Sequence, residues 1–228
     1  MRIFFAGLLG GIAMFIWTHL TYTVLPLGYI GIRGIPNETA VLGALQRNIA
    51  EESGVFIFPN PMLGPSQTAE QKAIARNNRA EKVARYPSGI LIYNAAGTRP
   101  IERFRWLSVE FVTELSEAIL AVFLLSRTCL TTFGARVGFV LAIGILVAFG
   151  TNVSYWIWYG FPGSYILAYM LTQVVGFLCV GLVAALVLKN QTLPAKAWFL
   201  PGISRVIFGR LSVCAASYGC VLVEQTTK

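Results

Sequence analysis

Two long runs of almost purely apolar residues in the second half of the chain most constrain how it folds. One spans Val137 to Trp158, and the next runs from about Ser164 to Leu188. Runs of about 18 or more apolar residues can cross the roughly 30 Å hydrocarbon core of a bilayer as helices. The composition agrees, because 56% of the residues are hydrophobic and only 12% are charged. Soluble domains carry roughly a quarter charged residues, so the sequence predicts an integral membrane protein.

Two further apolar runs predict a bundle of about four transmembrane helices. One extends from Ile3 to about Leu20 behind a single arginine. Because no small-x-small cleavage site closes this run, residues 1–20 are interpreted as an uncleaved signal anchor. The other run, from about Leu107 to Ser126, is interrupted by three glutamates. We expect transmembrane helices two to four within residues 107–188.

Residues 21–106 have the character of a water-facing domain and are expected to form a small α/β insert. Asn37 is a plausible N-cap for a helix that ends near Ile49. Thr68 and Gln71 have the spacing of a capping box and predict a second, highly polar helix.

Two short strands are predicted within the insert, at Gly54–Pro59 and around Ile90–Tyr93. Two strands alone form a marginal sheet in water. We therefore expect the sheet to depend on the helices of the insert or on a partner.

The segment 189–228 is apolar but broken by proline and arginine. It predicts an interfacial or re-entrant segment, with a fifth transmembrane helix as the alternative. Cys214 and Cys220 lie here, and we expect them to be unpaired apolar thiols rather than a disulfide. With one His and no Asp in the chain, too few ligands exist for a structural zinc or haem site, so no metal or cofactor is predicted.

Lysine and arginine in short loops indicate which ends of the helices face the cytoplasm. One side of a four-span arrangement carries Arg2, Arg127, Arg136, Lys189, Lys196, Arg205 and Arg210. The other side carries the insert and an uncharged turn. Arg99, Arg103 and Arg105 in the insert favour the opposite orientation, but the insert is longer than the loops for which the rule holds. We expect both termini in the cytoplasm and the insert outside.

Aromatic residues gather where the third apolar run ends. Tyr155, Trp156, Trp158 and Tyr159 form an expected aromatic belt at a membrane interface.

The glutamates of the second apolar run are the main candidates for chemistry. Glu110, Glu114 and Glu117 are spaced four and three residues apart, so they share one helix face. A carboxylate inside a membrane costs several kcal/mol unless it is protonated, paired or facing the bundle interior. One interpretation is a proton or cation relay, or a carboxylate that binds substrate. The other is structural, with Glu110 among headgroups, paired with Arg103 or Arg105, and Glu117 neutral and hydrogen-bonded.

The remaining polar residues of the apolar runs fall at similar depth. His19 ends the first run, Asn152 lies six residues before the outer end of the third, and Gln173 about nine residues into the fourth. Together with Glu110 and Glu114 they predict a polar layer beneath the insert. This layer is either a pocket for a headgroup, a quinone-like molecule or an ion, or a set of interhelical hydrogen bonds.

Small residues recur at a spacing of four, in Gly7 with Gly11 and in Gly134 with Gly138. Such pairs permit close packing of membrane helices or dimerisation. The basic helix around Arg76 to Arg85 lacks interleaved aromatics, so nucleic acid is not an expected partner. No motif of a nucleophilic, nucleotide-binding or zinc-dependent enzyme occurs, and no catalytic residue is assigned.

Four stretches, VLPLGYIGIRGIPNETAVLGAL, SGILIYN, YWIWYGFP and QVVGF, resemble a group of uncharacterised bacterial integral membrane proteins. The resemblance covers roughly residues 1–190 and implies one span, an extracytoplasmic insert and three further spans in the bacterial inner membrane. No activity is attached to that group.

The expected function is that of a non-enzymatic accessory, scaffold or assembly subunit of a membrane complex. Its expected partners are the lipid bilayer and other membrane subunits or a second copy of the chain. Two alternatives stay open: a small carrier or channel that uses the glutamates, and a membrane enzyme that binds lipid or quinone.

Overall fold

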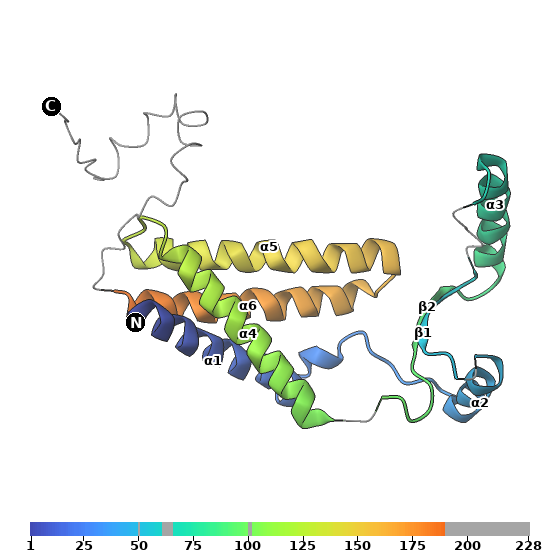
Figure 1. The fold of residues 1–228 in the computed structure, drawn as a ribbon, viewed down its shortest axis with the longest axis horizontal. Helices are drawn as coiled ribbons and strands as arrows, with labels where there is room; N and C mark the ends of the chain where they lie inside the picture. The colour runs from blue at the N-terminus through green and yellow to red at the C-terminus, as the bar shows by residue number, and fades with distance from the viewer. Residues whose placement is uncertain (50, 61–65, 100–101, 190–228) are drawn as a thin grey trace. The chain divides into compact units, whose positions relative to one another are not determined.

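The computed structural model describes residues 1–49, 51–60, 66–99 and 102–189 (Figure 1). Within them the helices are α1 (Arg2–Thr23), α2 (Glu38–Asn48), α3 (Ala69–Arg85), α4 (Arg103–Leu125), α5 (Phe133–Tyr159) and α6 (Gly163–Val187). A short 3-10 helix, η1 (Leu27–Tyr29), and the strands β1 (Gly54–Phe58) and β2 (Gly89–Tyr93) complete the described elements. A mainly helical fold with a small two-stranded sheet is confirmed.

Three of these helices, α1, α5 and α6, are long and apolar enough to cross a membrane. Helix α4 has 23 residues but is not among them, because its apolar stretch contains Glu110, Glu114 and Glu117. The predicted interfacial segment lies outside the described residues apart from Lys189, and so do Cys214 and Cys220.

The apolar helices extend a few residues beyond the runs that predicted them. Helix α4 begins at Arg103 rather than Leu107, and α5 begins at Phe133 rather than Val137. Hydropathy marks the part of a helix that lies in hydrocarbon, whereas backbone hydrogen bonds set where the helix ends. The Trp106 amide, for example, donates to the Glu102 carbonyl at 3.1 Å.

The contacts divide the chain into two units. The first comprises Met1–Phe15, Thr113–Ile143 and the described part of Gly176–Lys228, and the second comprises Ile16–Val112 and Gly144–Val175. The core of the first unit contains many small side chains beside larger ones such as Phe177 and Leu125. Its fully buried members include Ala6, Ala118, Ala121, Val122, Val140, Val180 and Ala184. Small residues let helix backbones approach closely, which is how helices associate in lipid.

Glycines make the closest helix contacts in the first unit. A methyl group built on Gly7 would lie 2.9 Å from the Ile119 Cα, and one on Gly11 would lie 2.9 Å from the Leu115 Cα. Helix α1 therefore packs almost backbone to backbone against α4, as the small-residue spacing predicted. The second predicted pair behaves differently, because nothing among the described residues lies within 4 Å of a methyl built on Gly134 or Gly138.

The second unit contains the insert, whose helices start as the sequence predicted. The Asn37 side chain accepts a hydrogen bond from the Ala40 amide at the start of α2. At the start of α3, the Gln71 amide donates to the Thr68 hydroxyl at 3.3 Å, and the Thr68 amide donates to the Gln71 side chain at 3.0 Å. Both helices lack any buried residue among those described, so the insert has little core of its own.

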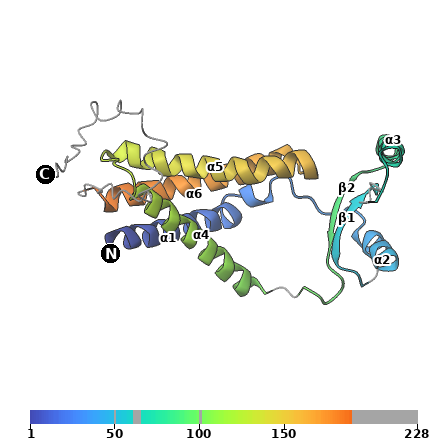
Figure 2. The ribbon, with the colours of Figure 1, turned by 45° about the horizontal axis from the view of Figure 1, so that its top comes forward.

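Strands β1 and β2 form an antiparallel ladder, which Figure 2 shows running along their length. The register pairs Gly54 with Tyr93, Val55 with Ile92, Phe56 with Leu91, Ile57 with Ile90, and Phe58 with Gly89. Because side chains alternate along a strand, Val55, Ile57, Ile90 and Ile92 share one side of the sheet, here named the aliphatic face. The opposite side carries the aromatic rings and Leu91.

Candidate functional site

The glutamates of α4 occupy three different environments. Glu114 is buried, with 5% of its surface exposed, whereas Glu117 is half-buried and Glu110 is exposed. The predicted common face is therefore not a row of equivalent carboxylates. A buried carboxylate at Glu114 fits the expectation that acids within an apolar helix turn toward the protein interior.

The start of α4 carries paired charges, but not the predicted pair. Arg105 bonds Glu102 at 3.2 Å, three residues earlier, instead of Glu110. A spacing of three lets both side chains extend from the same side of the first turn into water. The Arg99 guanidinium lies 5.3 Å from the centre of the Trp106 ring. A cation over an indole is a stabilising contact at a wet, partly apolar boundary.

Asn152 and Gln173 are brought together as the predicted polar layer required. The Asn152 side-chain amide donates to the Gln173 oxygen at 2.7 Å and to the Ala148 carbonyl at 2.8 Å. Asn152 is only 2% exposed. The first of these bonds joins α5 to α6, which lie side by side in both ribbon views (Figures 1 and 2). The Asn152 amide nitrogen and the Gln173 amide oxygen are thus paired within the protein.

A second polar link in the same unit was not predicted. The Trp17 indole N–H donates to the Thr172 carbonyl at 2.9 Å and joins α1 to α6. A tryptophan within an apolar helix needs an acceptor for its N–H. The presence of Trp17 in the first apolar run was therefore the sequence feature that could have predicted this link. The Thr172 hydroxyl in turn donates to the Ala168 carbonyl at 3.0 Å.

A small cavity lies next to this link. Its lining consists of Tyr22, Leu27, Gly28, Tyr165, Tyr169 and Thr172. The cavity volume is about 10 Å³, which is room for one water molecule at most. A quinone ring or a lipid headgroup does not fit in this cavity.

The other predicted residues of the layer and belt lie at the surface. His19 is exposed and does not line the cavity. The predicted belt residues Tyr155, Trp156, Trp158 and Tyr159 are between 43% and 79% exposed. Exposed aromatic rings at the end of an apolar helix are what an interface with lipid headgroups requires.

Arg136 was predicted as a loop charge and instead lies in the first turn of α5 with 1% of its surface exposed. Its Nε donates to the Leu130 carbonyl at 2.9 Å, and its Nη1 donates to the Leu188 carbonyl just beyond the end of α6. The last carbonyls of a helix lack partners within it and carry partial negative charge. The buried guanidinium therefore caps α6, a role that charge counting alone could not reveal.

The aliphatic face of the insert is largely uncovered within its unit. Val55 and Ile92 are each 64% exposed, and Ile57 is 42% exposed. The face carries no charge. Two strands alone form a marginal sheet, and this face adds little burial to it.

Among the described residues, no group of three or more His, Cys, Asp or Glu side chains is placed to hold a metal ion. Comparison with known proteins finds no family model, no curated protein and no solved structure that matches this chain.

Proposed function

We propose that α4 is a fourth transmembrane helix of a protein in the bacterial inner membrane, with both termini cytoplasmic and the insert outside. Two observations support the part of this proposal that concerns α4. At about 1.5 Å per residue, the 23 residues of α4 span roughly 34 Å, enough for the hydrocarbon core. Arg99 and Trp106 mark the wet end of the helix, and the acid nearest its middle, Glu114, is buried.

Fusions of alkaline phosphatase and of green fluorescent protein test this topology. Phosphatase activity after a fusion at Asn94, in the insert, and fluorescence after a fusion at Lys189 are the expected results. Fluorescence from the Asn94 fusion contradicts the proposed orientation.

Within that arrangement, the chain acts as a non-enzymatic accessory, scaffold or assembly subunit that presents its insert to another membrane protein subunit. The observation that carries this proposal is the aliphatic face, of which Val55, Ile57 and Ile92 are exposed. A subunit that covers this face supplies the apolar burial that α2 and α3 lack. Apolar area removed from water contributes about 25 cal/mol per Å², which favours association.

Gentle native purification of the full-length chain tests the proposal. The wild-type chain is expected to co-purify with a defined partner or with itself, and Val55→Thr with Ile92→Thr is expected to release that partner. Threonine keeps the branched Cβ, so the strands persist while the face becomes polar. Ile74→Thr is the matched control, because Ile74 is 53% exposed but lies on α3. A chain that purifies alone as a monomer contradicts the proposal.

The two alternative functions have tests of their own. A carrier or channel requires the α4 carboxylates, so solute flux into liposomes that survives Glu114→Gln and Glu117→Gln excludes it. A lipid or quinone enzyme requires a bound ligand, so mass spectrometry of the native preparation should find one.

A further inference from the structure

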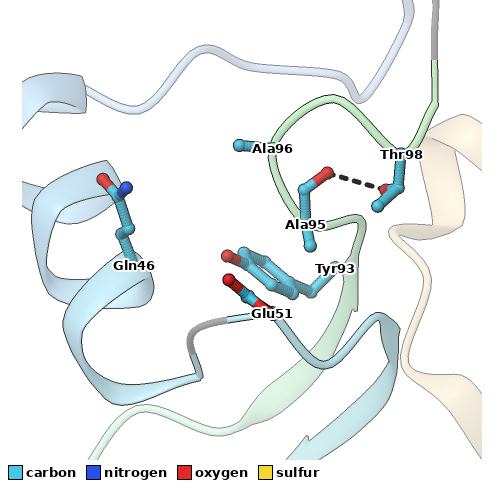
Figure 3. A pocket seen from close by; sticks show the side chains of 6 residues that line it. All are labelled: Gln46, Glu51, Tyr93, Ala95, Ala96 and Thr98. Carbon is cyan, nitrogen blue, oxygen red and sulfur yellow. Dashed lines mark hydrogen bonds between the residues drawn. The ribbon is translucent and has the colours of Figure 1, made fainter.

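The insert contains a hollow on the side of the sheet opposite the aliphatic face. Its volume is about 550 Å³, within the range of about 300–1,000 Å³ typical of small-molecule sites. Among the described residues, those that line it are Gln46, Glu51, Tyr93, Ala95, Ala96 and Thr98. They come from α2, from the segment before β1, and from β2 with the turn that follows it (Figure 3).

The wall formed by the turn after β2 is held in place by hydrogen bonds. The Ala95 amide donates to the Ser53 hydroxyl at 2.9 Å, and the Thr98 hydroxyl donates to the Ala95 carbonyl at 2.7 Å. Gly97 adopts a φ of 77°, which residues with a side chain rarely take, so glycine permits the turn. Ala95 itself is 6% exposed. This wall is therefore formed before any ligand arrives.

Polar side chains line the hollow from more than one element. Glu51 and Tyr93 both line the hollow, and in Figure 3 the Gln46 side chain stands apart from them on α2. The Tyr93 ring is itself fixed by an edge contact to Phe56, with ring centres 6.3 Å apart. A carboxylate accepts hydrogen bonds, and an aromatic face attracts cations.

From this arrangement we propose that the hollow binds an organic cation, either a primary ammonium or a guanidinium. Glu51 pairs with the charge, the Tyr93 ring packs against the alkyl or planar part, and Gln46 and Thr98 offer further hydrogen bonds. The cation belongs either to a free amine or to a lysine or arginine side chain of a polypeptide. The inference is independent of the proposed docking surface, because Tyr93 lies on the opposite side of the sheet from Val55 and Ile92.

Binding of two probes to the full-length chain in nanodiscs of zwitterionic lipid tests the site. The probes are agmatine, a free cation, and an acetylated and amidated Gly-Arg-Gly peptide, and saturation is followed by calorimetry or ligand-observed NMR. Zwitterionic lipid keeps the probes from binding the bilayer itself. Glu51→Gln removes the charge at constant shape and is expected to weaken binding about tenfold or more. Glu52→Gln is the matched control, because Glu52 does not line the hollow, and it should change affinity less than threefold.

Ala96→Leu provides a second test that leaves every charge in place. It fills part of the hollow and is expected to weaken binding comparably to Glu51→Gln. Tighter binding of agmatine than of the peptide assigns the site to a free amine, and the reverse order assigns it to a partner's side chain. The proposal is overturned if the wild-type chain saturates with neither probe, or if Glu52→Gln weakens binding as much as Glu51→Gln.

Discussion

The contact between α1 and α4 makes a quantitative prediction about two glycine pairs. In Gly7→Ala the new methyl would lie 2.9 Å from the Ile119 backbone, and in Gly11→Ala 2.9 Å from that of Leu115. Carbon atoms are most stable at about 3.5–4.0 Å, so each methyl overlaps its neighbour by roughly 0.6–1.1 Å. Backbone atoms cannot rotate away, and the two helices must separate. Overpacking of this kind costs about 1–3 kcal/mol.

Gly138→Ala and Gly134→Ala are the matched controls, because nothing among the described residues lies within 4 Å of the added methyl. All four substitutions replace glycine within a helix, and alanine favours the helix by about 0.8–1.0 kcal/mol at each position. That gain cancels when the two pairs are compared. The α1 variants should therefore be less stable than the α5 variants by about 1–3 kcal/mol per site.

The assay is reversible unfolding in mixed micelles with increasing dodecyl sulfate, followed by tryptophan fluorescence. The midpoint is expected to fall for the α1 variants and to stay or rise for the α5 variants. Equal midpoints for Gly7→Ala and Gly138→Ala would refute the reasoning, because the close approach of α1 to α4 would then carry no energetic consequence.

Three further experiments probe other contacts. Arg136→Leu leaves the Leu188 carbonyl without its donor and should lower the free energy of unfolding by about 1–3 kcal/mol. Arg136→Lys should restore part of that loss. An unchanged thermal midpoint in Arg136→Leu contradicts the capping role. A double-mutant cycle of Asn152→Ala and Gln173→Ala should give a coupling energy of about 0.6 kcal/mol, with an upper bound of about 1.7 kcal/mol. A coupling energy of zero argues against their hydrogen bond. Thr68→Ala should cost α3 about 1 kcal/mol and speed its amide hydrogen exchange, while Thr68→Ser should not.

Most elements of the fold follow from the sequence because their causes are local. An apolar run forms a helix in lipid since every backbone group must be bonded within the segment. The caps at Asn37 and Thr68 act over three residues, so their spacing in the chain is also their spacing in space. The strand positions followed from short apolar segments between turn residues.

The polar layer was only partly predictable. Depth along each apolar run correctly placed Asn152 near Gln173, because a helix rises by a constant amount per residue. Depth says nothing about where another helix packs against the residue and covers it. For that reason it could not tell that Glu114 is buried while Glu110 is exposed, or that His19 stays at the surface.

The apolar runs determine by themselves that the chain forms long helices suited to a membrane, and where those helices start and stop to within a few residues. Tertiary structure alone decided which small-residue pair packs against a neighbour, why Arg136 is buried, and that a hollow forms beside Tyr93. Each of these depends on contacts between segments far apart in the chain, and the side chains that meet there carry no local signal of their partners.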